Sequence, residues 1–357
     1  IWLLWAIKIN NIFYTIKYGK SMTFFLIILM IWAVASLLLR ESYLGELSIS
    51  FLPYWWAAMS IGLLISLWGL WKYLHWKKEE KTRFWIQFSI LFVVGFGSIL
   101  GVFLWKFHNF YNHYQLSRDS QANLKVLFSN IYKDNLGYDE LTGTLARENP
   151  DVAMFVEFEE HHYEHLKGFL EKQFAFVEYL PWSTSIVVSK YPLTLLPTSV
   201  KGQKWRYHYF QIQKGDQHYL AYLVHTSSPT SQRHFNNRNH QLKIISNDFL
   251  TMHQASRWEN GKVFMVWDFN ISPWSKYYEE FSNELSGTMD NATRSFPYYF
   301  SWNLAKLLRI SGTLEGVPEL FFSHIDQLLV SKSLKINSLT PLQFSWSDHK
   351  GFLFEIE

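Results

Sequence analysis

The hydrophobic pattern divides the chain into two parts. Three long apolar runs without a charged residue occupy the first third, at residues 22–39, 49–71 and 84–104. At about 1.5 Å of rise per residue, each run crosses or nearly crosses a hydrocarbon core of roughly 30 Å. The pattern therefore predicts three transmembrane α-helices in a membrane anchor over residues 1–107. Buried helices of a large soluble core are the alternative, which the short charged loops between the runs disfavour.

Lysine and arginine are unevenly distributed around these runs. The segment before the first run carries three of them and the loop at residues 72–83 carries five, whereas the loop between the first two runs has only Arg40. The positive-inside rule then places the N-terminus in the cytoplasm. Three crossings leave a periplasmic or extracellular domain on a multi-pass protein of the inner (cell) membrane. A secretory signal peptide competes for the first run, but no small-residue cleavage site follows residue 39.

The pattern changes after a polar, aromatic linker at residues 108–123. Short β-rich segments then alternate with amphipathic ones, which predicts an α+β domain over residues 124–357. Strands are expected at 124–130, 152–158, 184–189, 205–213, 218–225, 263–269, 324–331 and 351–356, and helices near 138–148, 160–172 and 232–252. Because strands are often adjacent in sequence, a sandwich is expected rather than a repeated βαβ array.

Polar residues of a restricted kind follow or interrupt these apolar strands. They are Asn130, Glu157, His225, Asp268, Asn270, Asp326, Asp348 and His349. Taken singly, an Asp or Asn after a strand is usually a turn former or a helix cap. Asp326 is harder to explain in this way, because a carboxylate inside an apolar strand must find a partner or lose several kcal/mol to desolvation.

Together these residues have a chemical logic. Carboxylate and amide oxygens are the ligands that hard divalent cations such as Mg²⁺ prefer. Two histidines and a spare carboxylate supply an acid, a base and an orienting group. The set is what the hydrolysis of a phosphate ester requires.

The order of the motifs resembles the endonuclease/exonuclease/phosphatase superfamily. The motifs are the Asn of "LKVLFSN", the Glu of "NPDVAMFVEF", the His of "HTSSP", the Asp-x-Asn of "WDFN", the Asp of "IDQLLVS" and the final "SDH". The resemblance covers residues 124–357 and implies a deoxyribonuclease I-like, four-layer fold, with a two-sheet β-sandwich flanked by helices. The anchor resembles that of bacterial members with three transmembrane helices ahead of the catalytic domain.

The resemblance also implies a metal site and its ligands. Glu157 would be the principal ligand of Mg²⁺ or Mn²⁺, with Asn130 and Asp348 nearby. Asp268 and Asn270 would position or deprotonate the attacking water and hold the phosphate.

The same resemblance assigns the remaining polar residues to the catalytic group. His349 would be paired with Asp326, and His225 would stabilise the phosphate or protonate the leaving oxygen. Either Asp268 or His349 is the general base. Arg238, at the start of the helix after "HTSSP", is a candidate contact to the substrate phosphate.

The chain departs from the family pattern at three places. Trp267 stands where most relatives have Gly, and strand alternation points it away from Asp268, so it either fills core or crowds the site. Gly351 stands where relatives often have Pro, which we expect to be tolerated. No acidic residue lies in "TSIVVSK" to pair with His225, which disfavours a nuclease of the deoxyribonuclease I type.

Charge and composition narrow the function further. The absence of cysteine excludes disulfides and cysteine-ligated zinc. Residues beyond 107 hold 23 basic against 26 acidic residues, a net charge of −3. That part therefore lacks the basic excess with which proteins grip DNA non-specifically.

Two functions remain. The leading hypothesis is a membrane-anchored, metal-dependent phosphoesterase acting outside the cytoplasm on a phospholipid headgroup, another envelope phosphodiester or nucleic acid. The alternative is a binding or sensory module that kept the fold and lost the chemistry. The lipid bilayer and the phosphate-ester substrate are the expected partners, and no obligate protein partner is inferred.

Overall fold

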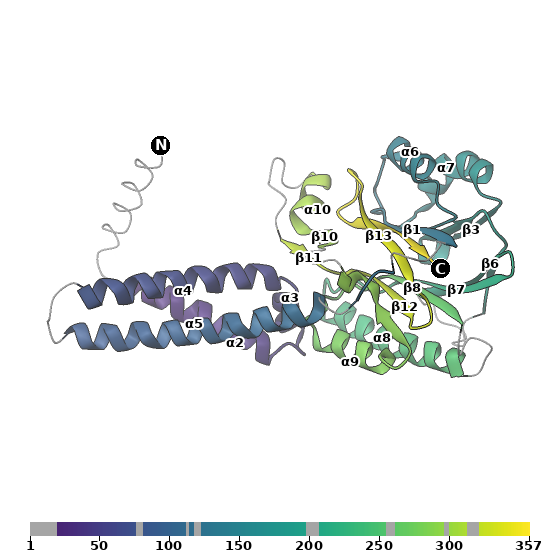
Figure 1. Cartoon of the computed structure of the whole chain (residues 1–357). Helices are drawn as coiled ribbons and strands as arrows, with labels where there is room; N and C mark the ends of the chain where they lie inside the picture. The colour runs from purple at the N-terminus through teal and green to yellow at the C-terminus, as the bar shows by residue number, and fades with distance from the viewer. Residues whose placement is uncertain are drawn as a thin grey trace. The chain divides into compact units, whose positions relative to one another are not determined.

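The chain divides into two compact units, Ile1–Lys106 and Phe107–Glu357 (Figure 1). The computed structural model describes residues 20–75, 81–111, 114–117, 123–197, 207–254, 261–295, 300–312 and 321–357. The expected linker at 108–123 therefore lies partly outside the described residues.

The first unit is helical. Its helices are α2 (Lys20–Leu38), α3 (Tyr43–Ile49), α4 (Leu52–His75) and most of α5 (Lys81–Tyr111). Ser42 begins α3 as an N-cap, since its hydroxyl accepts a 3.2 Å hydrogen bond from the backbone N–H of Gly45. The long apolar runs thus form helices, as their composition predicts.

The expectation of three transmembrane helices is not supported. Among the described residues, only Ser89–Tyr111 is a helix both long and apolar enough to cross a membrane. Leu26–Leu38 and Tyr43–Ile49 meet at a bend of 110°, so they count as a second span only if taken as one broken helix, and Leu52–Trp68 is shorter. The helices α2 and α4 nevertheless coincide closely with the first two apolar runs.

The last turn of α5 belongs to the second unit and packs within it. The hydroxyl of Tyr111 lies 2.8 Å from Nδ1 of His324, and the ring of Phe110 meets that of Trp274 edge-on. Arg294 donates from Nε to the carbonyl of Phe110 over 2.7 Å. These contacts fix the end of α5 against the segments around residues 274 and 324.

Two six-stranded sheets form the centre of the second unit. The first has the order β13 (Ile336–Gln343), β14 (Lys350–Ile356), β1 (Leu124–Asn130), β2 (Val152–Val156), β4 (Ser185–Ser189), β3 (Phe176–Leu180). The second has the order β5 (Leu193–Leu195), β6 (Tyr207–Lys214), β7 (Gln217–His225), β8 (Lys262–Asp268), β12 (Asp326–Ser331), β9 (Met289–Asn291). A separate pair consists of β10 (Trp302–Asn303) and β11 (Phe322–Ser323).

The main core lies between the two sheets. Val126 and Phe128 of β1 point into it, together with Val266 of β8, whereas Leu127 joins a second core on the outer face of the first sheet. Strand alternation sends successive side chains to opposite faces, and both faces are covered here. This explains why β1 and β8 are apolar almost throughout.

Helices cover both outer faces (Figure 1). Helices α6 (Tyr138–Glu148) and α7 (Glu160–Gln173) place Leu145 and Leu166 in the outer core of the first sheet. Helices α8 (Gln232–Gln254) and α9 (Lys276–Leu285) cover the second sheet, where Phe281 of α9 packs edge-on against Trp267. The four-layer α+β sandwich expected from the sequence is confirmed.

Most strands expected in the soluble part are present, with ends shifted by a few residues. Residues 205–206 of one expected strand lie outside the described residues. The sequence did not predict β3, β5, β9, β10, β11, β13, α9 or a further helix, α10 (Leu304–Ile310). Several of these are two or three residues long, and β13 contains Pro341, which an edge strand tolerates because no ladder bond is required there.

Candidate active site

The polar residues expected from the sequence come together where strands of both sheets end. Strands β1 and β2 are parallel, as are β7 and β8, so each pair delivers its C-terminal residues to one edge. His225 is level with Asp268, and the antiparallel β12 places Asp326 opposite Asp268. Asp348 and His349 precede β14, which pairs with β1. Sheet register therefore gathers residues that are far apart in sequence.

Asn130 connects the two sheets. Its Nδ2 donates to Oε1 of Glu157 over 3.1 Å and to Oδ2 of Asp268 over 2.9 Å. Its Oδ1 accepts a 2.9 Å hydrogen bond from the backbone N–H of Tyr132. The amide group thus separates two carboxylates and orients both.

Glu157 follows β2 in a left-handed backbone conformation, with φ of 55°. Its Oε2 accepts a 3.0 Å hydrogen bond from the backbone N–H of Lys133. A positive φ is uncommon for a residue other than glycine, and such residues gather where the surrounding structure imposes the conformation. The turn directs the carboxylate toward His225, whose Nε2 lies 3.7 Å from Oε1.

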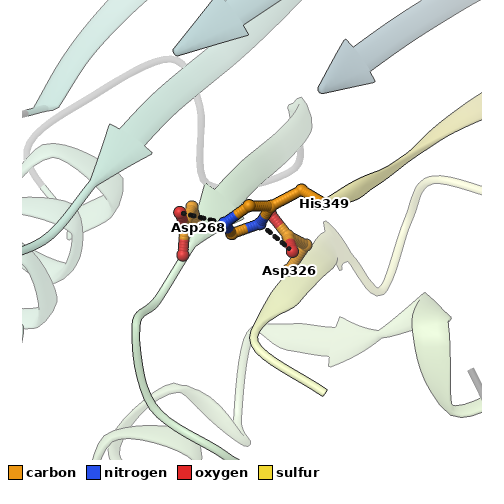
Figure 2. A group of neighbouring side chains, drawn as sticks. All are labelled: Asp268, Asp326 and His349. Atoms are coloured by element: carbon orange, nitrogen blue, oxygen red, sulfur yellow. Dashed lines mark hydrogen bonds and ion pairs between the residues drawn. The ribbon is translucent and has the colours of Figure 1, made fainter. Parts of the chain in front are cut away.

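Asp326, His349 and Asp268 form a row across the site (Figure 2). Nδ1 of His349 is 2.8 Å from Oδ2 of Asp326, and its Nε2 is 3.9 Å from Oδ2 of Asp268. All three side chains are buried. The expected pairing of His349 with Asp326 is therefore present, and it leaves Nε2 directed toward Asp268.

His225 lies between two carboxylates. Its Nε2 is 3.7 Å from Oε1 of Glu157 and 3.8 Å from Oδ2 of Asp268. This histidine therefore lies near negative charge even though the acidic residue of the family pattern is missing.

Asn270 turns the chain after β8. It has φ of 48°, its backbone N–H donates to Oδ1 of Asp268 over 3.0 Å, and its Nδ2 donates to the carbonyl of Thr226 over 3.0 Å. The turn closes back on Asp268 and fixes the orientation of its carboxylate. Both residues of the Asp-x-Asn motif are thus parts of one hydrogen-bonded loop.

Arg238 lies behind this loop. Its side chain is 0% exposed, its Nη1 donates to the carbonyl of Asn270 over 2.7 Å, and its Nε donates to Oδ1 of Asn239 over 2.9 Å. The guanidinium does not face solvent in this structure. The structure therefore favours support of the Asn270 loop over the direct phosphate contact expected from the sequence.

Trp267 lies on the far side of β8 from Asp268. Its ring stacks on Phe269 at 3.7 Å between centroids and packs edge-on against Phe281. Since the side chain is fully buried among aromatic residues of the helix-covered face, it fills core. Trp267 does not crowd the site.

Gly351 lies tightly against strand β1. A Cβ atom at this position would lie 2.4 Å from the carbonyl oxygen of Phe128 and 2.7 Å from Cβ of Ser129. Strand β1 approaches so closely that a larger residue requires a backbone shift. The glycine is a steric requirement of this chain, and not simply a tolerated replacement for proline.

Sequence reasoning missed the residues that support Asp348. The indole Nε1 of Trp302 donates to Oδ2 of Asp348 over 2.7 Å across 46 residues of sequence. The hydroxyl of Ser347 donates to the carbonyl of Asn130 over 2.8 Å. Ser347 is the serine of the final "SDH" motif, whereas Trp302 belongs to no motif whose order indicates the family, so no sequence signal identified Trp302.

Burial and like charge shift the pKa of the carboxyl groups. Burial and the nearby Asp326 carboxylate raise the pKa of Asp268 to about 7. Burial also raises the pKa of Asp348. At Glu157 burial acts in the same direction, but the positive charges of His225 and His349 outweigh it and lower the pKa.

At His349, burial and the nearby carboxylates act on the pKa in opposite directions. Burial lowers the pKa of its imidazole, but the carboxylates of Asp326, Asp268 and Asp348 outweigh burial and raise this pKa well above its ordinary value. These carboxylates therefore favour the imidazolium form. In that form both ring nitrogens are donors.

The donor set fits a divalent cation. The site gathers the carboxylates of Glu157, Asp268, Asp326 and Asp348 around two histidines, which leaves an excess of buried negative charge. A hard cation would offset that charge through oxygen ligands. One atom each of Asp268, Asp326 and His349 lie within 4.8 Å of one another, close enough to hold an ion.

Comparison with known proteins agrees with this geometry. The family model described as "Endonuclease/Exonuclease/phosphatase family" matches residues 121–349. No curated protein sequence matches the chain closely enough to count as a relative.

Solved structures similar to this chain have low sequence identity to it. D. rerio TDP2 complexed with a single-strand DNA product is 15% identical with a TM-score of 0.50, over 66% of this chain and 98% of that one. The human nocturnin catalytic domain with bound sulfate is 16% identical with a TM-score of 0.45, over 66% and 94%. A mannosyl-6-phosphatase from Bacteroides thetaiotaomicron is 13% identical with a TM-score of 0.46, over 66% and 99%.

Proposed function

Because the chain belongs to the endonuclease/exonuclease/phosphatase family, we propose that it is a divalent-metal-dependent hydrolase of a phosphodiester or phosphomonoester. The observation that carries this proposal is the convergence of Glu157, Asp268 and His349 from both sheets on one site. Residues that served only as turn formers would not be expected to converge from positions about 190 residues apart in the sequence.

Asp268 is the group best suited to take a proton from the attacking water. With a pKa of about 7, it is largely ionised just above neutral pH and yet basic enough to accept a proton. Its two oxygens are held by the backbone N–H of Asn270 and by Nδ2 of Asn130. These bonds fix the carboxylate without protonating it.

His349 then supplies positive charge rather than acting as the base. The carboxylate of Asp326 accepts from Nδ1, which leaves the N–H at Nε2 to face the phosphoryl oxygens. Charge builds up on those oxygens as water attacks the phosphorus and the bond to the leaving oxygen breaks. Fixed donors aimed at that charge lower the barrier.

A second group must protonate the leaving oxygen. His225 stands beside Glu157 and Asp268, so its imidazole can donate to the leaving oxygen when the phosphorus–oxygen bond breaks. Mg²⁺ or Mn²⁺ held by Glu157 and Asp348, with Asn130 beside them, would offset charge on the phosphate.

The proposed location is a membrane surface outside the cytoplasm. The apolar stretch Ser89–Tyr111 follows a segment with five Lys and Arg between residues 72 and 83. A single crossing by the part of this helix before Phe107, with the basic segment in the cytoplasm, puts the second unit on the opposite side. The proposal therefore needs one span and not three.

The substrate class stays open between lipid and nucleic acid. The net charge of −3 beyond residue 107 argues against non-specific binding of DNA. A phospholipid headgroup or another envelope phosphodiester suits an anchored enzyme better. Supercoiled plasmid, sphingomyelin and phosphatidyl lipids, compared at equal metal concentration, separate these substrates.

The test of the reaction uses the full chain in detergent with a chromogenic phosphodiester and monoester. We expect hydrolysis with Mg²⁺ or Mn²⁺, loss with EDTA, and large losses in Glu157→Gln and His349→Ala. The exposed Glu164→Gln is the matched control and should retain activity. Binding without turnover would favour the alternative of a sensory module, and activity indifferent to chelator and substitutions would exclude the assigned site.

A further inference from the structure

One short segment, residues 301–303, holds the last part of the site along its backbone. Lys350 donates its N–H to the carbonyl of Ser301 over 2.6 Å, and Asn303 donates its N–H to the carbonyl of Asp348 over 3.1 Å. Trp302 and His349 form an antiparallel bridge between these bonds. The backbone of Asp348 and His349 is therefore fixed against this segment.

The same segment also holds the partner of His349. The hydroxyl oxygen of Ser301 accepts hydrogen bonds from the N–H groups of Ile325, at 3.1 Å, and Asp326, at 2.9 Å. Residues 301–303 thus contact both members of the Asp326 and His349 pair. Pairing of β10 with β11 keeps the segment in place, because Trp302 lies opposite Ser323.

The side chain of Trp302 adds a contact that the backbone does not provide. Its Nε1 donates to Oδ2 of Asp348 over 2.7 Å, and Asp348 is only 5% exposed. An indole N–H is a donor only, so it can satisfy a carboxylate but cannot compete as a ligand. Donation to Oδ2 fixes the rotation of the carboxylate and leaves Oδ1 outside this bond.

We propose that Trp302 is a positioning residue for the cation site, acting through Asp348. This inference rests on the proposed function, since it assumes that Asp348 contributes a metal ligand. Hydrogen-bond partners behind a metal ligand orient it, and their loss typically costs 10- to 100-fold in metal affinity. Trp302 itself does not touch the metal or the substrate.

The primary variant is Trp302→Phe, which keeps an aromatic ring and removes the N–H. Direct Mn²⁺ binding to the full chain in detergent, followed by EPR, should weaken by about 10- to 100-fold. The metal concentration that gives half-maximal activity should rise by the same factor, while kcat at saturating metal changes much less. Equal Mn²⁺ affinity in Trp302→Phe and the unmodified protein would overturn the proposal.

Trp346→Phe is the matched control. Trp346 is also close to Asp348 in sequence, is 48% exposed, and makes no hydrogen bond to a site carboxylate within the part of the chain that the structure describes. Its substitution should leave Mn²⁺ affinity and activity unchanged. An equal loss in both variants would mean a general effect of replacing tryptophan and would defeat the proposal.

A second pair of variants tests the proposal if Trp302→Phe does not fold. Trp302→Gln retains an N–H donor, whereas Trp302→Met is of similar length without one. We expect tighter Mn²⁺ binding in Trp302→Gln than in Trp302→Met, and equal binding would refute the inference. In an Asp348→Asn background the effect of Trp302→Phe should vanish, because both act through one carboxylate.

Measurements on the unmodified protein distinguish failure of the proposed function from failure of the role of Trp302. If it neither binds Mn²⁺ nor shows chelator-sensitive hydrolysis, the proposed function fails and takes this inference with it. If it does both and Trp302→Phe matches it, only the role of Trp302 fails.

Discussion

The carboxylate of Asp326 and the imidazole of His349 are hydrogen-bonded between Oδ2 and Nδ1 at 2.8 Å, deep in the second unit. Strand β12 supplies the first residue and the turn before β14 supplies the second, so the pair joins the two sheets. The bond holds one ring nitrogen and directs the other toward Asp268. Orientation and charge of the imidazole therefore depend on a residue from the opposite sheet.

Replacing Asp326 should impair catalysis through His349. Asp326→Asn removes the charge that raises the pKa of His349, so the imidazole loses its proton at lower pH. We expect kcat to fall by about 10²- to 10⁴-fold, and the alkaline limb of the pH profile to move to lower pH. Asp290→Asn, at an exposed position of β9, is the control and should leave the profile in place.

Asp268 should make the metal-free protein less stable as pH rises. Its pKa is about 7 in the folded state, against about 3.9 in an unfolded chain. Its proton therefore favours folding, and this stabilisation is lost as pH rises from about 4 to about 7.

Asp268→Asn tests that relationship. In EDTA the variant should unfold at a higher temperature than the unmodified protein at pH 8, and at a similar temperature at pH 4. Thermal unfolding of the full chain in detergent measures both. A stability difference that is the same at the two pH values would show that the carboxylate does not carry the raised pKa.

Arg238 should act on the Asn270 loop rather than on the substrate. Arg238→Met leaves the carbonyl of Asn270 without this donor, at a cost of about 1–3 kcal/mol. We expect a lower unfolding temperature and a lower kcat, with little change in KM for a small phosphodiester. Arg233→Met, at an exposed position of the same helix, is the control. A selective rise in KM for Arg238→Met would instead indicate direct contact with the phosphate.

Gly351 should resist substitution. Gly351→Ala places a Cβ atom 2.4 Å from the carbonyl oxygen of Phe128, so the pairing of β14 with β1 must shift. Overpacking of this kind costs about 1–3 kcal/mol. Gly143→Ala, in α6 with nothing near the new Cβ, should instead stabilise by about 0.5–1 kcal/mol. Chemical denaturation that ranked the two variants equally would contradict the steric argument.

Hydropathy and strand patterning predicted much of the fold. The apolar runs of β1, β2 and β8 were recognisable because strands covered on both faces have little room for polar residues. Short or irregular strands such as β10 and β13 were not, because two residues or a proline give no period. Hydropathy predicted three transmembrane helices, whereas among the described residues only Ser89–Tyr111 is long and apolar enough to cross a membrane as a single helix.

The sequence by itself determined which residues have the chemistry for the site, because their order along apolar strand ends resembles one family. Only the tertiary structure decided that Arg238 lies behind the Asn270 loop, that Gly351 lies against β1, and that Trp302 donates to Asp348. The physical reason is distance along the chain. Side-chain type is local information, whereas burial and hydrogen-bond partners depend on sheet register between strands that are dozens of residues apart.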